Sequence, residues 1–71
     1  MHIEETTITL NGARHDLSSA CTITNLLEQL DLTGQRVAVE INREIIPRAQ
    51  HTTHHVHPGD VVEIVHFVGG G

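Results

Sequence analysis

The amino-acid sequence predicts an α+β fold, a small roll in which a mixed sheet packs on one helix. Several short segments place apolar residues at every second position, whereas one segment places them at helical spacing. Asn11-Gly12, between two of the short segments, is a strong hairpin signal. A dense apolar run, Val61–Val65, lies near the end of the chain. We expect the first and last strands to lie parallel at the centre of the sheet.

The first predicted element is a β-hairpin. Residues Thr6–Leu10 alternate between polar and apolar side chains, which is the period of a half-buried strand. Asn11-Gly12 suits a type I′ turn because both positions tolerate positive φ. The return strand should run from Ala13 to about Ser18, with Leu17 pointing inward.

A single helix is predicted after the hairpin, with Thr22 as its N-cap. The apolar residues that recur at helical spacing are Ile23, Leu26, Leu27 and Leu30. This stripe should face the core. We expect the helix to end near Asp31 or Leu32, with Gly34 available for a left-handed turn.

Cys21 is the only cysteine, so no internal disulfide can form. It directly precedes the predicted N-cap, where a thiol can become reactive because its pKa falls. It can equally serve as a small apolar packing residue. We favour packing, because neither a histidine nor a second cysteine stands at a partner position.

Two further strands are expected to follow the helix. Val37–Ile41 alternates, with its apolar residues inward and Glu40 outward. Asn42-Arg43 can form a tight turn into Ile45-Ile46. Pro47 has no amide hydrogen to donate, so the second strand should be short or lie at a sheet edge.

Residues 48–57 are polar, and we expect them to be irregular with one helical turn. Four histidines crowd this segment: His51, His54, His55 and His57. Histidines at such spacing can bind zinc or nickel, but no cysteine or carboxylate stands among them. We favour a solvated loop and expect no metal site. Pro58-Gly59-Asp60 then predicts a turn into the last strand.

The last strand has two different faces. Glu63 should not be buried unpaired, so Val62 and Ile64 are the expected core pair. Val65 and Phe67 then face solvent. Exposed apolar residues beside a chain end are typical of a docking patch, although Phe67 could instead fold over the sheet edge to cover the core.

The chain closes with Gly69, Gly70 and Gly71. Because glycines have no side chain to pack, we predict a folded domain over residues 1–67 and a flexible tail over residues 68–71. Such a tail can thread a narrow channel and present the α-carboxylate of Gly71 to another protein. A frayed end, a linker or a cloning remnant would also explain a glycine run.

Composition narrows the classes of function. Nine acidic residues against four arginines and no lysine give a formal charge of −5 with histidines neutral. This charge disfavours nucleic acid and favours a basic protein surface as partner. We expect a cytoplasmic protein without membrane contact, because no apolar run approaches the roughly 20 residues of a membrane span. A 71-residue chain with one aromatic residue offers little room for an enzyme's own active site.

Motifs spread over nearly the whole chain resemble the ThiS family, the ubiquitin-like β-grasp sulfur carriers of thiamine biosynthesis. The matching segments are Leu10-Asn11-Gly12, Thr22-Ile23, Leu26-Leu27, Leu30, Val37–Asn42, Ile46-Pro47-Arg48, Gly59-Asp60 and Gly70-Gly71. The most discriminating part is Ala-Val-Glu-Ile-Asn followed by Ile-Pro-Arg. The sequence departs from the family in about five extra N-terminal residues and in the histidine-rich segment.

The resemblance implies a protein co-substrate and not an enzyme. A ThiF-type adenylyltransferase, using ATP and magnesium, would adenylate Gly71, and a persulfide enzyme would supply sulfur to make a C-terminal thiocarboxylate. A ThiG-type thiazole synthase would then accept the sulfur. The resemblance also implies that the body docks through Glu63, Val65 and Phe67 and that the carrier itself binds no cofactor.

Two other classes of protein share such a fold and tail. The small subunit of molybdopterin synthase remains in a stable complex with its large partner. A ubiquitin-like modifier is joined to lysines of other proteins. The short length and the stretch from Asn42 to Arg48 favour the ThiS family over the molybdopterin synthase subunit. Conjugates that survive reducing, denaturing electrophoresis would reveal a modifier. The sequence leaves open the immediate sulfur donor, the oligomeric state and the role of the histidines.

Overall fold

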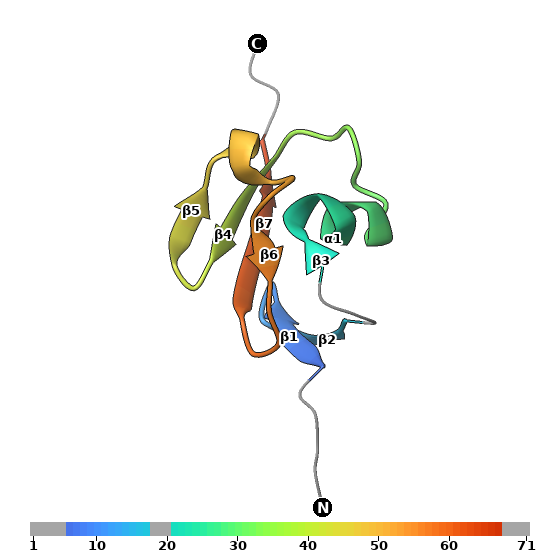
Figure 1. Cartoon of the computed structure of the whole chain (residues 1–71), viewed down its shortest axis with the longest axis vertical. Helices are drawn as coiled ribbons and strands as arrows, with labels where there is room; N and C mark the ends of the chain where they lie inside the picture. The colour runs from blue at the N-terminus through green and yellow to red at the C-terminus, as the bar shows by residue number, and fades with distance from the viewer. Residues whose placement is uncertain (1–5, 18–20, 68–71) are drawn as a thin grey trace, which may run out of the picture.

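The computed structural model describes residues 6–17 and 21–67 (Figure 1). The elements in chain order are β1 (Thr7–Leu10), β2 (Ala13–Asp16), β3 (Cys21–Thr22), α1 (Ile23–Gln29), β4 (Val37–Ile41), β5 (Glu44–Ile46), the 3₁₀ turn η1 (Arg48–Gln50), β6 (His55–Val56) and β7 (Val61–His66). Ser18, where we expected the second strand to end, and residues 1–5 lie outside the described residues. The predicted α+β roll is confirmed.

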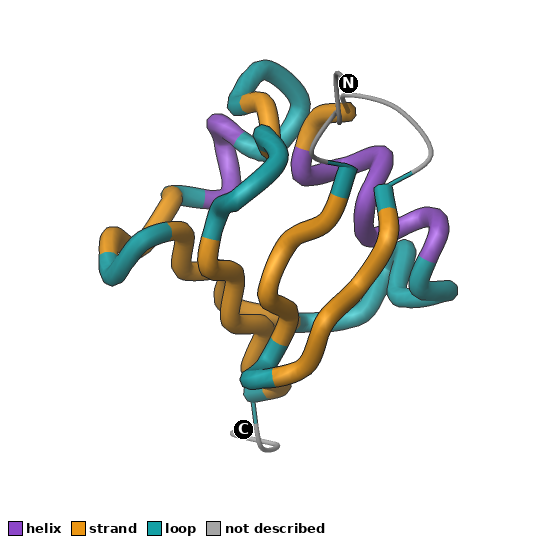
Figure 2. Tube along the Cα trace, turned by 90° about the horizontal axis from the view of Figure 1, so that it is seen from below, coloured by secondary structure: helices purple, strands orange, loops and turns teal. Residues whose placement is uncertain are grey.

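Five strands form one mixed sheet in the order β2-β1-β7-β4-β5. The pair β1–β7 is parallel, whereas β1–β2, β4–β5 and β4–β7 are antiparallel. The last strand therefore occupies the centre of the sheet beside the first, as predicted. β5 lies at an edge, as Pro47 indicated. Figure 2 shows the strands curving around the interior, with α1 packed on one side of the sheet.

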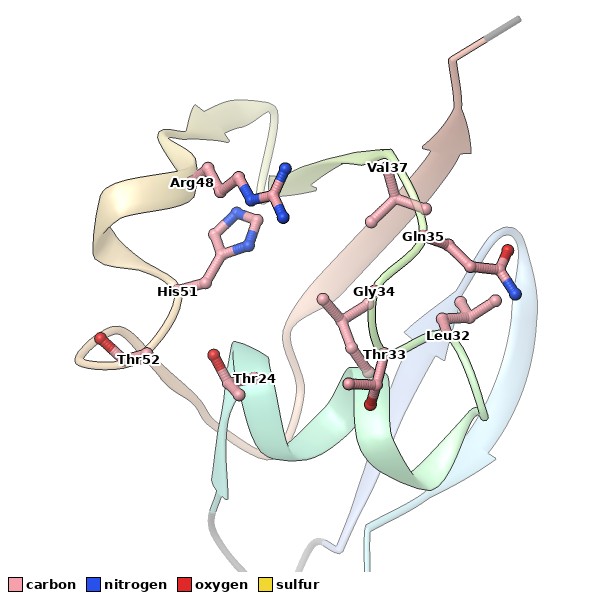
Figure 3. A pocket seen from close by; sticks show the side chains of 10 residues that line it. Thr24, Leu32, Thr33, Gly34, Gln35, Val37, Arg48, His51 and Thr52 are labelled. Atoms are coloured by element: carbon pink, nitrogen blue, oxygen red, sulfur yellow. The ribbon is translucent and has the colours of Figure 1, made fainter. Parts of the chain in front are cut away.

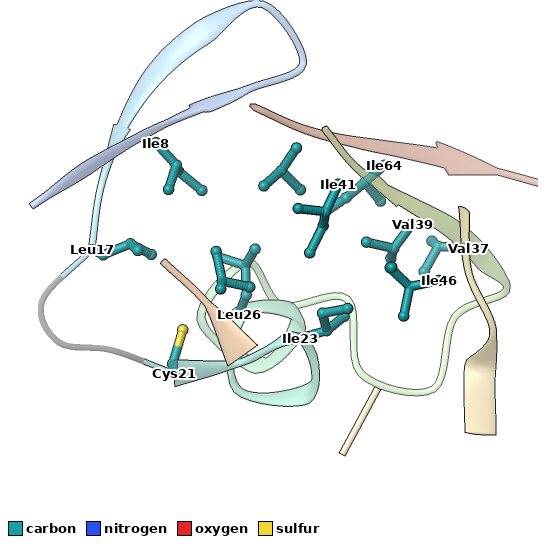
Figure 4. Packing of buried hydrophobic residues seen from close by; sticks show 12 residues of the cluster. Ile8, Leu17, Cys21, Ile23, Leu26, Val37, Val39, Ile41, Ile46 and Ile64 are labelled. Atoms are coloured by element: carbon teal, nitrogen blue, oxygen red, sulfur yellow. The ribbon is translucent and has the colours of Figure 1, made fainter. Parts of the chain in front are cut away.

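The hydrophobic core lies between this sheet and α1 (Figure 4). The alternating strand residues supply one side of it and the helix supplies the other. The fully buried larger side chains are Ile23, Leu26, Val39, Val56 and Val62. Val62 and Ile64 are both buried, so the predicted inward face of β7 is correct.

Turns with positive φ connect the strands. Asn11 and Gly12 have φ values of 49° and 83°, and Asn42 and Arg43 have values of 52° and 71°. Both hairpins therefore use the paired left-handed conformation that matches the right-handed twist of strands. The turn before β7 likewise places Gly59 at a φ of 89°.

Asn42 also connects two turns that are distant in the sequence. Its side-chain amide donates to Asp60 Oδ1 (3.1 Å), and its side-chain oxygen accepts from the Val61 amide (2.9 Å). The other carboxylate oxygen of Asp60 accepts from the His57 amide (2.9 Å). These bonds hold the start of β7 beside the β4–β5 hairpin.

The N-terminus of α1 follows the prediction, but its C-terminus does not. Thr22 is the N-cap, and its side chain forms a reciprocal capping box with Asn25. The helix ends at Gln29, earlier than the expected Asp31 or Leu32. Asp31 itself adopts a φ of 61°, and the Leu32 amide donates to the Leu27 carbonyl (2.8 Å). This is a Schellman termination, with an aspartate in the position where glycine is more common.

The segment 48–57 is more ordered than its composition predicts. The expected helical turn is present as η1. The same segment also contains β6, which pairs antiparallel with β3 and buries Val56 completely. Our expectation of an irregular loop was wrong here because the single apolar residue that anchors β6 has no apolar neighbour along the chain.

Candidate functional site

The candidate site lies at the end of β7, where the described chain stops at Phe67 (Figure 1). The Phe67 amide donates to the Arg36 carbonyl (3.1 Å), which holds Phe67 beside the segment that leads into β4. Gly69, Gly70 and Gly71 lie outside the described residues. The modification at Gly71 and the tail over residues 68–71 therefore stay predictions.

Exposed apolar side chains occupy the sheet near this end. Val65 is 62% exposed and Phe67 is 63% exposed, as the alternation of β7 predicted. The alternative in which Phe67 folds over the sheet edge is wrong at this exposure. Ile45 on β5 is 69% exposed and was missed as a site residue. The signal was present in the sequence, because a strand that buries Ile46 must turn Ile45 outward.

A surface hollow of about 360 Å³ adjoins Phe67. Ala38, Ile45 and Pro47 contribute apolar walls, and Arg36 also lines it. The hollow forms where β5 ends at the proline and β4 continues. Glu63 is exposed on β7, also as predicted. The three predicted docking residues therefore lie at alternate positions along β7 and just after it, on the solvent-exposed side of the sheet.

Cys21 is a packing residue. Its side chain is only 5% exposed and belongs to the core cluster. Burial raises the pKa of the Cys21 thiol above its ordinary value. A protonated, buried thiol is a poor nucleophile, which confirms the packing interpretation.

The histidine-rich segment divides into buried and exposed parts. His51 is 7% exposed, and its Nε2 donates to the Ile46 carbonyl (3.0 Å). His55 and His57 are exposed, with ring centroids 6.4 Å apart. The expectation of a solvated loop was therefore wrong for His51. Within residues 6–17 and 21–67, no three histidine, cysteine or acidic side chains come together in a way that could hold a metal ion.

A second pocket lies between η1 and the segment that joins α1 to β4 (Figure 3). Arg48 and His51 form one wall, Gln35 comes from the connecting segment, and Val37 is the first residue of β4. Its volume is about 200 Å³. Sites for small organic ligands usually measure about 300–1,000 Å³, so this pocket is smaller than a typical substrate site.

Comparison with known proteins assigns the chain to a family. The family model described as "ThiS family" matches residues 5–71. The chain belongs to the ThiS family. It is 46% identical over 50 residues to the sulfur carrier protein ThiS of Bacillus subtilis, covering 70% of this chain and 76% of that protein.

A solved structure supports the same placement in the ThiS family. The crystal structure of the thiamine biosynthesis protein ThiS from Geobacter metallireducens matches with a TM-score of 0.80 at 32% identity. The match covers 92% of this chain and 99% of that chain. The fold is therefore the ubiquitin-like β-grasp of this family.

Among residues 6–17 and 21–67, none of the helices has the length and hydrophobicity that a membrane span requires.

A longer relative bears a different name. The thiazole synthase of Paramagnetospirillum magneticum is 39% identical over 64 residues, which is 90% of this chain. The chain spans only 20% of the length of that protein. A ThiS-like segment thus forms a small part of a protein named for thiazole synthesis.

Proposed function

We propose that this protein is a sulfur carrier of thiamine biosynthesis that delivers sulfur as a thiocarboxylate on Gly71. The observation that carries the proposal is the family match, which extends through residue 71 and therefore includes the glycine run. The thiazole synthase relative supports the same pathway, because it joins a ThiS-like segment to a protein of that name.

The chemistry begins with the unreactive carboxylate of Gly71. A ThiF-type adenylyltransferase uses ATP and magnesium to convert it to an acyl adenylate, releasing pyrophosphate. The terminal sulfur of a persulfide enzyme then attacks the carbonyl carbon, and AMP leaves. Cleavage of the resulting acyl disulfide by a second thiol leaves the thiocarboxylate on the carrier and a disulfide on the donor side. The thiocarboxylate is ionised at neutral pH and serves as the nucleophile in a ThiG-type thiazole synthase.

The carrier acts in this scheme as a co-substrate with no metal or cofactor of its own. Gly69 and Gly70 let the reactive end enter two different active sites. Glu63, Val65 and Phe67 hold the body against each enzyme. Their exposure on the strand that leads into the glycine run supports this role.

Intact-protein mass spectrometry tests the proposal. The full chain is incubated with ATP, magnesium, a persulfide source and a ThiF-type enzyme. We expect a mass gain equal to the exchange of one oxygen for sulfur, mapped to Gly71 by fragmentation. A variant lacking Gly71 is the matched control and should gain nothing.

The opposite result would reject the proposal. If the chain gains no mass with an enzyme that is active on another carrier, a different function must be sought. Covalent conjugates to lysines that survive reducing, denaturing electrophoresis would then indicate a ubiquitin-like modifier.

A further inference from the structure

The pocket beside η1 brings a cation and a buried histidine together, away from the candidate docking residues. Arg48 begins η1 and His51 caps its end, and the His51 amide donates to the Arg48 carbonyl (3.0 Å). Side chains at positions i and i+3 of a 3₁₀ turn lie on the same side, so the guanidinium and the imidazole share one wall of the pocket (Figure 3). Glu63, Val65 and Phe67 do not line this pocket.

The hydrogen bond of His51 determines which of its ring nitrogens is available to a ligand. Nε2 lies 3.0 Å from the Ile46 carbonyl oxygen, which can only accept, so Nε2 carries the proton of the neutral ring. Nδ1 then presents an unshared electron pair, and no group within residues 6–17 and 21–67 bonds to it. In the described part of the chain, no fully buried side-chain nitrogen or oxygen lacks a partner. Nδ1 is therefore an acceptor that remains reachable on a side chain only 7% exposed.

The Arg48 guanidinium adds a permanent positive charge to the same wall. Its side chain is exposed, and it makes no ion pair or side-chain hydrogen bond with the described residues. A guanidinium binds a planar carboxylate through two parallel hydrogen bonds. A single permanent charge is balanced by a monoanion, so a carboxylate suits this wall better than a phosphate dianion.

The other walls of the pocket include apolar side chains. Leu27 comes from α1, Leu32 from the segment that follows it, and Val37 from the start of β4. The Thr24 amide donates to the His51 carbonyl (3.0 Å), and this bond connects the two sides of the pocket. Since the volume is only about 200 Å³, the occupant must be a molecule of few atoms with a short aliphatic part.

We propose that this pocket binds a short aliphatic α-hydroxy acid. The carboxylate pairs with the Arg48 guanidinium, the hydroxyl donates to Nδ1 of His51, and the alkyl chain lies against Leu27, Leu32 and Val37. The two polar groups share one wall, so the carboxylate and the hydroxyl belong on adjacent carbons. A simple fatty acid would leave Nδ1 without a donor, and an alcohol would leave the guanidinium without an anion.

The proposed site lies close to the strand that leads to the candidate functional site. Gln35 also lines the pocket, and its side-chain oxygen accepts from Nε2 of His66 at the end of β7 (2.9 Å). A bound ligand is therefore separated from β7 by one side chain. Binding itself involves neither Gly71 nor the docking residues, so it is independent of the proposed function.

Titration of the full chain with α-hydroxyisovalerate, followed by nuclear magnetic resonance, tests the proposal. We expect saturable shifts at Leu27, Val37 and Arg48 and at the Nδ1 resonance of His51, which accepts the new hydrogen bond. The dissociation constant should be on the order of 1 mM, because so small a ligand makes few contacts. If these resonances do not move at concentrations well above that value, the proposal is wrong.

Two related ligands separate the contributions without changing the protein. Isovalerate lacks only the hydroxyl and should bind about two- to tenfold more weakly, which corresponds to one neutral hydrogen bond. Isobutanol keeps the hydroxyl and the branched chain but has hydrogen in place of the carboxylate, so we expect no saturable binding. Isovalerate that binds as tightly as the hydroxy acid would exclude the role of His51 and overturn the proposal.

Arg48→Gln tests the protein side of the same contact. The variant should bind α-hydroxyisovalerate about tenfold more weakly or worse, because it loses hydrogen bonds between charged groups. Arg14→Gln is the matched control, since Arg14 is exposed on β2 and does not line the pocket. Equal affinities of the two variants would mean that the ligand responds only to net charge, and the proposed site would be rejected.

Discussion

His51 connects the histidine-rich segment to the edge of the sheet through its bond to the Ile46 carbonyl. We expect His51→Ala to lower the free energy of unfolding by about 1–3 kcal/mol, since it removes a buried donor and leaves the carbonyl without its partner. Urea denaturation measures this change. His57→Ala is the control, because His57 is exposed on the same segment and should change stability by less than about 0.5 kcal/mol. Equal effects of the two substitutions would contradict the structural role of His51.

Cys21 makes stability depend on pH in the alkaline range. Burial raises the pKa of its thiol, so the unfolded chain loses this proton at lower pH than the folded chain. The stabilisation is therefore complete below the unfolded pKa of about 8.5 and is lost as the pH rises through the raised folded value. The chain has no tyrosine or lysine to obscure this effect.

We expect the free energy of unfolding to decrease above about pH 8.5, by at most about 1.4 kcal/mol per pH unit. Denaturation curves recorded across this range measure the slope. Cys21→Ala should remove the cysteine's share of that slope, even though it costs some packing energy. An unchanged slope in the alanine variant would show that Cys21 does not titrate differently in the folded state.

The seven-residue helix α1 depends on its capping box more than a longer helix would. The Thr22 hydroxyl accepts from the Asn25 amide, and the Asn25 side chain accepts from the Thr22 amide, each at 3.2 Å. We expect Thr22→Ala to cost about 1 kcal/mol, measured as a lower urea midpoint. Thr22→Ser retains the hydroxyl and should stay close to the unmodified chain. A serine variant as unstable as the alanine variant would assign the effect to packing.

Elements with a local signal could be predicted from the sequence, and elements that depend on distant partners could not. The turns at Asn11-Gly12 and Asn42-Arg43 carry their own preference for positive φ, so both hairpins were found. The pair of β3 and β6 joins two-residue strands that are far apart in the chain. Neither strand is long enough to show a period. The early end of α1 was missed because Asp31 already adopts a positive φ of 61°, and the left-handed conformation predicted for Gly34 follows it with a φ of 83°.

One part of the candidate docking surface could be predicted from the sequence of a single strand, and another part depends on how two strands pair. Val65, Phe67 and Glu63 could be assigned to one side of β7, since alternation and the cost of burying a carboxylate decide the matter within one strand. The opposition of Glu40 and Glu63 requires the register between β4 and β7. That register is set by tertiary packing, which no local pattern contains. The opposition of the two carboxylates is thus visible only in the folded molecule.

At the scale of the whole molecule, the core residues and the residues proposed to react occupy different parts of the sequence. The hydrophobic core extends in sequence from Ile8 to Ile64, and β7 ends at His66. We therefore expect removal of residues 68–71 to change the free energy of unfolding by no more than about 0.5 kcal/mol, the range of ordinary surface changes. For a domain of this size, that corresponds to a shift of about 2–4 °C in melting temperature.

The same truncation should abolish the sulfur gain completely while leaving the body able to bind the adenylating enzyme through Glu63, Val65 and Phe67. Thermal unfolding, mass spectrometry and calorimetry on one variant therefore test stability, chemistry and docking together. A loss of stability above about 1 kcal/mol, well outside the range of ordinary surface changes, would place residues 68–71 within the fold and reject the predicted boundary after Phe67. If the truncated chain keeps its stability but gains no sulfur, residues 68–71 serve the chemistry and contribute nothing to folding. The role of the fold would then be to position this reactive end.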